Sequence, residues 1–538
     1  LSDPLERVML AFRGTTVPSW LRQRLADAPA AGFTLFRPNN VRSPEQVRDL
    51  TAELQAAARA RPGAADDPPL LIAADQEGGQ LMALGDGFTP FAGPMAIGAT
   101  GDAELARRVG EAIGQELRAV GVNVDYAPVL DVAINPANPS LGIRSFGDDP
   151  AEVARLGHAW LDGLQAQGVA ATAKHFPGSG GLMADTHHGL GVVDRSEADL
   201  QAVELAPFRA AFDAGVRMVM SGHFAVPALT GDRTQPSTLS RRMMWGLLRE
   251  ELGFEGVSIT DALDMKAIPQ GAAQARAVVE ALDAGVDLLL TTADRRAQLR
   301  IEQALRRAAE DDLLDAGAAA ASTARVRKLR QWVERVGETP LDVVGSAHNR
   351  ALARELAARS LTLVRDAAGT LPLRPGTGAR IGAVMPAPRD LTPADTSSYV
   401  QPSLAAALRE FHPAVDEIVT SHPPTVAEIA AIRDRAGEWE AIVVGTISAA
   451  PGSEQGALVD ALLSTGRPVI TVALRTPWDL AAYPRAGTHV ATFSLLRDSM
   501  DALAAAVFGK AGFPGRLPVR LDADDRGAAR TDAGGAAA

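Results

Sequence analysis

The densest run of polar side chains in this sequence lies between residues 174 and 188. It begins with Lys174 and His175 and ends in an Asp185-x-His187 pattern. An aspartate two positions before a histidine can reach the imidazole within a turn, where the carboxylate fixes the ring tautomer and raises its basicity. Such a pair forms a general acid or base that works near neutral pH. The alternative interpretation is a surface loop in which Asp185 caps a helix.

A second candidate for chemistry is a lone carboxylate that follows an apolar run. Asp261 comes directly after residues 256–260, which have the composition of a buried strand. A carboxylate at such a place costs free energy unless it is paired or functional. Lys174 and His175 are available partners for it. The alternative role, capping the next helix, suits Asp264 better than Asp261.

The elements that must position these residues form a regular alternation. Short apolar runs typical of strands occur at 8–12, 33–36, 70–74, 122–126, 169–173, 217–220, 256–260 and 287–290. The longer segments between them have apolar residues at helical spacing, as for a helix that covers one face of a sheet. Eight strand–helix units over about 330 residues predict a (β/α)8 TIM barrel. A doubly wound open sheet is the competing architecture.

In a barrel, the carboxyl ends of all strands meet at one rim, and active sites of this fold lie there. Polar residues follow five of the predicted strands. They are Asp75, Asp125, Lys174, His175, His223 and Asp261. We therefore predict that these side chains belong to one site.

The rest of the chain predicts a second domain. Residues 1–336 are assigned to the barrel, and residues 337–350, with one proline and several polar residues, to a linker. A further alternation of strands and helices over 351–525 indicates a second α/β domain. It begins with a helix expected at 351–359, and strands are expected at 361–365, 381–385, 441–446, 468–474 and 490–494. The segment 526–538 is rich in Gly, Ala and Asp, and is predicted to be disordered.

Composition excludes several classes of function. The chain of 538 residues has a net charge of −12 and no block of Lys or Arg, which argues against nucleic-acid binding. It has no cysteine, so disulfides, zinc–thiolate sites, iron–sulfur clusters and cysteine nucleophiles are excluded. No apolar run approaches the roughly 20 residues of a membrane span. The first residues do not read as a signal peptide, although the absence of an initiating Met leaves open that a segment was removed.

Several motifs together resemble glycoside hydrolase family 3, in its β-N-acetylglucosaminidase branch. They are Lys174-His175-Phe176-Pro177-Gly178 with Asp185-Thr186-His187, Asp75-Gln76-Glu77-Gly78-Gly79, Arg144-Ser145-Phe146-Gly147 and Thr260-Asp261-Ala262-Leu263-Asp264-Met265. Ala358-Arg359-Ser360-Leu361, Leu371-Pro372-Leu373 and Gly512-Phe513-Pro514-Gly515 are similar to the C-terminal α/β sandwich domain of that family. The resemblance thus covers both predicted domains.

The resemblance implies an exo-acting, retaining β-N-acetylglucosaminidase that needs no metal and no organic cofactor. It implies Asp261 as the nucleophile and His187 as the general acid/base, oriented by Asp185. The substrate-binding residues would be Asp75, Arg144, Lys174 and His175, and we add His223, which follows another strand. The expected partner is an oligosaccharide or small molecule with a terminal N-acetylglucosamine, with no nucleic acid and no membrane. We expect a monomer or homodimer in the cytoplasm, and secretion stays open.

The sequence departs from the family pattern at two places. Ser179 stands where the family often has a histidine, and Gln80 and Ala83 stand where it usually has arginines. Those arginines tend to lie on the leaving-group side, so a preference for a charged, muropeptide-type aglycone is not supported. Because Asp185 and His187 supply an acid/base, the second domain is expected to have a structural or subsite role.

Three other functions stay open at the sequence level. A histidine acid/base repels an anionic nucleophile less than a carboxylate would, so phosphate could replace water and make the protein a glycoside phosphorylase. A β-glucosidase is the second alternative. A catalytically silent carbohydrate-binding protein is the third.

Overall fold

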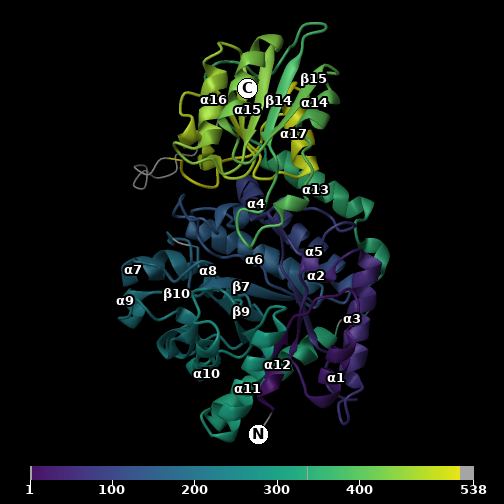
Figure 1. Cartoon of the computed structure of the whole chain (residues 1–538), viewed down its shortest axis with the longest axis vertical. Coiled ribbons are helices and arrows are strands. Elements are labelled where there is room, and N and C mark those ends of the chain that lie inside the picture. Colours follow the sequence, from purple (N-terminus) through teal and green to yellow (C-terminus); the bar gives the residue numbers. More distant parts are fainter. Residues whose placement is uncertain (1–2, 184, 336, 338, 522–538) are drawn as a thin grey trace.

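The computed structural model describes residues 3–183, 185–335, 337 and 339–521. The chain forms two domains, a larger N-terminal one that is purple to teal and a smaller C-terminal one that is green to yellow (Figure 1). The tail predicted at 526–538 lies outside the described residues. In the part of the chain that is described, no helix has both the length and the apolar character needed to cross a membrane.

The first domain is the predicted barrel. Its eight parallel strands are β1 (Val8–Leu10), β2 (Gly32–Thr34), β3 (Leu71–Ala74), β6 (Val124–Asp125), β7 (Ala170–Phe176), β9 (Met218–Ser221), β11 (Val257–Thr260) and β12 (Leu289–Leu290). They pair in chain order, and β12 pairs with β1. A bridge between Ile259 and Leu288 closes the ring between β11 and β12. The predicted barrel is thus confirmed. Most of its strands are shorter than the apolar runs suggested, but β7 is longer and extends to Phe176.

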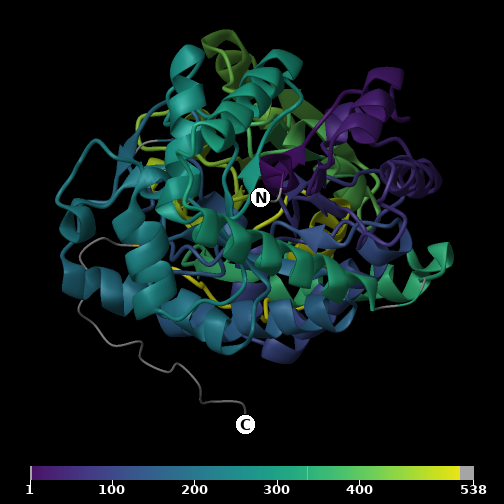
Figure 2. The ribbon, with the colours of Figure 1, turned by 90° about the horizontal axis from the view of Figure 1, so that it is seen from below.

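Helices surround the strands (Figure 2). They are α1 (Ser19–Asp27), α2 (Arg37–Asn40), α3 (Pro44–Arg59), α4 (Pro94–Thr100), α5 (Ala103–Ala119), α6 (Pro150–Ala166), α7 (Glu197–Asp199), α8 (Ala206–Asp213), α9 (Pro227–Thr230), α10 (Ala272–Ala284), α11 (Arg295–Glu310) and α12 (Ala316–Glu334). Ser43 and Asp149, each followed by a proline, are the N-cap residues of α3 and α6. At each, the Ser or Asp side chain accepts a backbone N–H of the first turn, which leaves fewer unpaired donors at that helix end.

The second domain is a three-layer α/β sandwich. Its sheet has the order β13 (Thr362–Asp366), β18 (Thr488–Ala491), β17 (Val469–Ala473), β16 (Ala441–Thr446), β14 (Ile381–Pro386) and β15 (Val415–Thr420). Only β13 is antiparallel to its neighbour. Apolar residues of α14 (Leu404–Arg409) and α17 (Arg497–Val507) pack on one face of the sheet, and those of α15 (Val426–Arg435) and α16 (Glu454–Leu463) on the other.

Two elements of this domain differ from the sequence-based expectation. No strand was expected at β15, because only its end residues, Val415 and Thr420, are buried, and the acidic Asp416 and Glu417 interrupt the apolar pattern. As an edge strand, β15 needs only one buried face. The helix α13 (Ala347–Ser360) begins before the expected position 351, where the Ser346 side chain accepts the Asn349 N–H.

The helices α5 and α6 approach each other closely through glycines. A Cβ atom on Gly163 would lie 2.0 Å from the Arg107 carbonyl oxygen, and one on Gly110 would lie 2.1 Å from the Trp160 carbonyl oxygen. Since both contacts are with backbone, side-chain rotation cannot relieve them. This helix pair flanks β6 and β7, which carry part of the site described below.

We expect Gly163→Ala to destabilise the protein by about 1–3 kcal/mol, because the added methyl must push the two helices apart. Thermal unfolding followed by circular dichroism measures this. Gly437→Ala is the matched control, because a Cβ there meets no atom within 4 Å. Equal melting temperatures for the two variants would contradict the close packing of α5 on α6.

Candidate active site

A pocket at the carboxyl ends of the barrel strands brings together four of the predicted site residues. Arg144, His175, His187 and Asp261 all line it. The apolar side chains of Leu141, Leu182, Phe224 and Met265 complete its wall. The pocket encloses about 380 Å³. Polar groups that converge in a partly apolar pocket are typical of a site for a small molecule.

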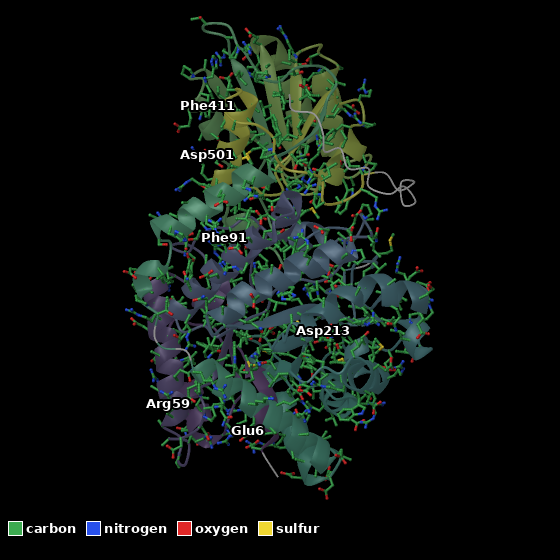
Figure 3. All side chains as sticks on the ribbon, turned by 180° about the vertical axis from the view of Figure 1, so that it is seen from behind. Glu6, Arg59, Phe91, Asp213, Phe411 and Asp501 are labelled. Atoms are coloured by element: carbon green, nitrogen blue, oxygen red, sulfur yellow. The ribbon has the colours of Figure 1, made fainter. Side chains whose placement is uncertain are left out.

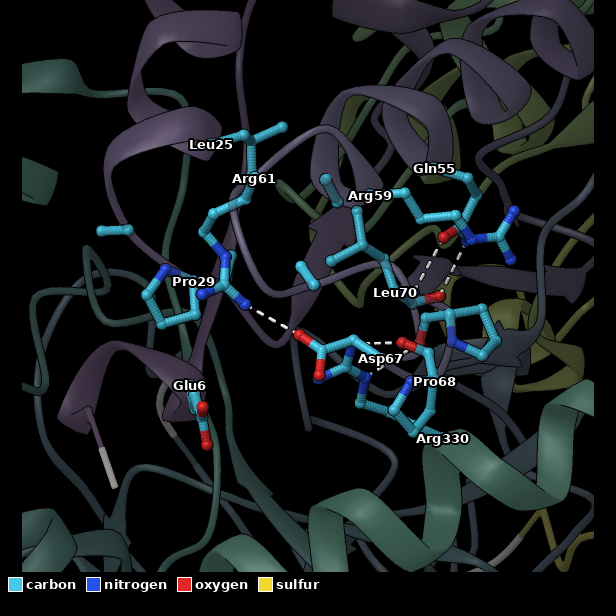
Figure 4. A pocket seen from close by; sticks show the side chains of 15 residues that line it. Glu6, Leu25, Pro29, Gln55, Arg59, Arg61, Asp67, Pro68, Leu70 and Arg330 are labelled. Carbon is cyan, nitrogen blue, oxygen red and sulfur yellow. Dashed lines mark hydrogen bonds and ion pairs between the residues drawn. The ribbon is translucent and has the colours of Figure 1, made fainter. Parts of the chain in front are cut away.

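Another pocket lies at the opposite end of the barrel (Figure 4). Glu6 and Leu70, which line it, precede the strands β1 and β3, and Arg330 of α12 donates a hydrogen bond to the Pro69 carbonyl at 2.9 Å. Figure 3 places Glu6 at the end of the barrel away from the second domain. None of the predicted site residues lines this pocket. Contacts at this face hold the barrel together and do not form the predicted site.

Asp261 directly follows β11, as predicted. Its Oδ1 accepts the Ala262 N–H at 2.7 Å. Burial by itself would raise the pKa of Asp261, but the nearby histidines, His175 foremost, and the Ala262 N–H hold it below its ordinary value. Asp261 is therefore an ionised carboxylate at neutral pH, in a position to attack a bound molecule.

Asp185 and His187 form the predicted pair. Oδ1 of Asp185 lies 2.7 Å from Nδ1 of His187 and also accepts the His187 N–H at 2.9 Å. Burial would lower the pKa of His187, but the hydrogen bond to Asp185 and the negative charge of Asp261 raise it. The imidazole can therefore carry a proton near neutral pH.

The loop that carries this pair is fixed by neighbouring segments. Nδ2 of Asn135 donates to the Leu182 carbonyl at 2.7 Å, and Nδ2 of Asn138 donates to the Ser179 carbonyl at 2.8 Å. The Lys266 N–H, which belongs to the loop after Asp261, donates to the His187 carbonyl at 3.4 Å. The loops of the acid/base candidate and of the carboxylate are thus connected directly.

A buried ionic network forms the other side of the site. Nζ of Lys174 lies 2.7 Å from Asp75 and 2.6 Å from Glu77. Arg144 donates two parallel hydrogen bonds to Glu77, at 2.9 and 2.8 Å. Burial would raise the pKa of Glu77, but the charges of Arg144 and Lys174 lower it to about 2. Glu77 is therefore ionised and lies between two cations.

His175 and His223 are placed differently from each other. Nδ1 of His175 lies 2.7 Å from Asp131, and its ring lines the pocket. His223 is completely buried, with Nδ1 2.8 Å from the Thr238 hydroxyl and Nε2 3.2 Å from the Ala262 carbonyl. Both ring nitrogens of His223 thus contact protein groups, and one of them holds the residue that follows Asp261.

Comparison with known proteins decides the family. The model for the "Glycosyl hydrolase family 3 N terminal domain" matches residues 14–329. The chain is 31% identical to beta-hexosaminidase A of Pseudoalteromonas piscicida, over 94% of this chain and 92% of that protein. The chain belongs to glycosyl hydrolase family 3. The resemblance inferred from the motifs is thereby confirmed.

Two further family members match over most of the chain. A beta-N-acetylglucosaminidase/beta-glucosidase of Cellulomonas fimi is 30% identical, over 88% of this chain and 87% of that protein. The solved structure of a glycoside hydrolase family 3 beta-N-acetylglucosaminidase from Paenibacillus sp. str. FPU-7 superposes with a TM-score of 0.89 at 34% identity. That match covers 96% of this chain and 98% of the other. Both domains of this glycoside hydrolase thus share their arrangement with that enzyme.

Two carboxyl groups near the site were not among the predicted site residues, and a third was predicted to belong to the site without a role. Glu77 stands in a predicted loop, and Asp131 lies between apolar residues that gave no functional signal. Asp125 was noted after a strand without a role. Its Oδ1 accepts the Gln76 N–H at 2.9 Å and its Oδ2 has no partner. Burial raises the pKa of Asp125 to about 8, so at neutral pH it is protonated. The roles of these three carboxyl groups depend on which charged side chains lie beside them in the folded chain, and the sequence alone does not show that.

The pKa of His187 provides a direct test of its coupling to Asp185. Asp185→Asn should lower the pKa of His187, because the substitution removes a negative charge that favours the protonated ring. The measurement is an NMR titration of the imidazole. Asp194→Asn, which removes an exposed carboxylate paired with Arg233, is the control and should leave that pKa unchanged. An unaltered titration in Asp185→Asn would show that the pair does not set the protonation of His187.

Proposed function

We propose that this protein is an exo-acting, retaining β-N-acetylglucosaminidase. The observation that carries the proposal is that the Asp185–His187 pair and the ionised Asp261 meet at one pocket on the barrel rim. The names of the family members described above support N-acetylglucosamine as the sugar. The compartment and the choice between monomer and homodimer stay predictions from the sequence.

In the first step, a carboxylate oxygen of Asp261 attacks the anomeric carbon and forms a covalent glycosyl–enzyme. His187 donates its proton to the departing glycosidic oxygen in the same step. The raised pKa of His187 fits this role, because the ring must be protonated when the substrate binds. Asp185 orients the ring and stabilises its positive charge.

In the second step, His187, now neutral, removes a proton from a water molecule. That water attacks the anomeric carbon, and Asp261 is released with retention of configuration. The lowered pKa of Asp261 fits a group that must leave as a carboxylate.

The buried ionic network is suited to hold the sugar. Asp75, whose side chain is 22% exposed, can accept hydrogen bonds from sugar hydroxyls while Lys174 fixes its position. Arg144 and His175 line the pocket and can donate to hydroxyl or acetamido oxygens. His223 contributes by holding the backbone at Ala262 in place, which makes it a positioning residue for Asp261.

Removal of the proposed nucleophile should abolish turnover. We expect Asp261→Asn to lower kcat/KM for an aryl β-N-acetylglucosaminide by more than about 10³-fold while the protein stays folded. Asp264→Asn is the control from the same loop, where Oδ2 accepts only the Thr292 hydroxyl, and should keep its activity. Normal turnover in folded Asp261→Asn would end the proposal.

Two assays of the wild-type protein test the alternative functions. Formation of a sugar 1-phosphate in phosphate buffer would identify a glycoside phosphorylase. Faster cleavage of an aryl glucoside than of the aryl β-N-acetylglucosaminide would identify a β-glucosidase.

The two chemical steps should respond differently when His187 is removed. In His187→Ala, cleavage of a poor leaving group such as a second sugar should slow by about 10²–10⁴-fold. A good leaving group such as dinitrophenolate needs no proton, so its departure should be nearly unaffected, and hydrolysis of the intermediate should become limiting. Azide needs no base and should restore turnover, giving a β-glycosyl azide.

His188→Ala is the matched control, because this neighbouring side chain is 69% exposed and lies 4.0 Å from Asp185. Its kinetics should stay close to those of the wild type. If the defect of His187→Ala were the same for good and poor leaving groups, the acid/base role would belong to another residue.

A further inference from the structure

A short hairpin follows Asp75 directly. It is formed by β4 (Gln76–Gly78), which contains Glu77, and β5 (Leu81–Met82). These two strands pair only with each other and join neither the barrel nor the second sheet. An isolated two-stranded hairpin is marginally stable at best. Because Glu77 must stay within hydrogen-bond distance of both Arg144 and Lys174, other contacts have to fix the hairpin.

The second domain supplies several of those contacts. Thr396 accepts the Met82 N–H at 3.1 Å and donates its hydroxyl to the Gln80 carbonyl at 3.0 Å. The Thr396 N–H donates to the same carbonyl at 2.7 Å. Gln80 Nε2 donates to the Ala394 carbonyl at 3.2 Å. One residue of the second domain thus holds the hairpin turn at Gln80 and the strand β5 at Met82.

The Gln80 side chain also meets a charged pair of the second domain. Arg475, which follows β17, donates to Oε1 of Gln80 and to Asp395 at 2.7 Å. Asp395 in turn accepts the Ser397 N–H at 2.8 Å. Gln80, Asp395 and Arg475 are each no more than 4% exposed. Position 80 therefore points into the contact between the domains and not toward a leaving group.

The same contact touches the segment that holds Arg144. A Cβ atom on Gly142 would lie 3.3 Å from Oε1 of Gln80 and 3.9 Å from Nη2 of Arg475. Arg144 follows two residues later and forms the parallel hydrogen bonds to Glu77. On the barrel side, the Gly79 N–H donates to the Phe91 carbonyl at 2.8 Å. Figure 3 shows Phe91 where the barrel meets the second domain.

We propose that Thr396, Asp395 and Arg475, here named the interdomain clamp, are positioning residues for the sugar-binding network. The clamp fixes the hairpin through Gln80, the hairpin fixes Glu77, and Glu77 fixes Arg144 and Lys174. Asp75 then receives its position from Lys174. The second domain thereby acts on catalysis without contributing a group that touches the substrate. This inference rests on the proposed function for its kinetic readout.

The test uses substitutions in the full-length protein that remove the contacts to the hairpin. Gln80→Leu removes the hydrogen bonds to Arg475 and Ala394, and Thr396→Val removes the hydroxyl bonds to Gln80 and Met82. We expect kcat/KM for an aryl β-N-acetylglucosaminide to fall by about 10- to 100-fold, with a rise in KM and in the inhibition constant of free N-acetylglucosamine. Gln80→Glu keeps an acceptor for Arg475 and should restore most of the activity.

Two controls separate positioning from a general loss of stability. Trp439→Phe removes an indole N–H that donates to Asp416 at 2.8 Å inside the second domain, before the start of β16. Glu355→Gln weakens another ion pair between the domains, which Arg108 forms at 2.9 Å. Both controls should keep the wild-type KM even where the melting temperature falls.

Hydrogen exchange provides a readout that needs no substrate. Amides of residues 76–83 should exchange faster in Gln80→Leu and Thr396→Val than in the wild type and the two controls. Wild-type exchange together with wild-type kcat/KM in both hairpin variants would overturn the inference. If the wild-type protein does not cleave the aryl glycoside, the proposed function fails while the exchange experiment still decides whether the clamp fixes the hairpin.

Discussion

The buried carboxylate of Glu77 is the interaction on which the site depends. Its side chain has no exposed surface and lies between two cations, Arg144 and Lys174, each bonded to it at 2.9 Å or less. Burying a charge costs several kcal/mol unless partners surround it with good geometry, and removal of one partner leaves the others uncompensated. The three groups therefore hold one arrangement. That arrangement positions two groups suited to contact a sugar. Glu77 positions Arg144 directly, and it positions Asp75 by way of Lys174.

This constraint explains why the site needs both domains. The barrel supplies Lys174 on β7, whereas Glu77 stands on a hairpin outside the barrel sheet. A rigid strand end can position a side chain by itself, but a two-stranded hairpin cannot. The helix α13 packs its Leu352, Ala353 and Leu356 into the core of the first domain and so fixes the second domain against it. The proposed role of Arg475 and Thr396 follows from that fixed placement.

The sequence predicted most of the fold and the residues at strand ends, because apolar periodicity reports directly on burial. Asp261 follows β11, and Lys174 and His175 lie at the carboxyl end of β7, so the barrel topology alone brings them together. The strand β15 was missed since an edge strand shows a weaker apolar pattern, and Glu77 and Asp131 were missed since their partners lie far away in the chain. His223 stands at a strand end as predicted, but its full burial and its bond to the Ala262 carbonyl depend on how neighbouring loops fold.

The protonation of two carboxyl groups at strand ends shows how the same residue type is set for different tasks. Asp125 and Asp261 are both buried, and burial alone raises both pKa values. Asp125 adjoins Asp75 and Glu77, whose charges are already matched by Lys174 and Arg144, so no cation remains for it and it stays protonated. The nearby histidines and the Ala262 N–H lower the pKa of Asp261, so it ionises. A carboxylate in place of His187 would add another uncompensated negative charge beside Asp261, whereas an imidazole can deliver a proton and become neutral as the proposed glycosyl–enzyme forms.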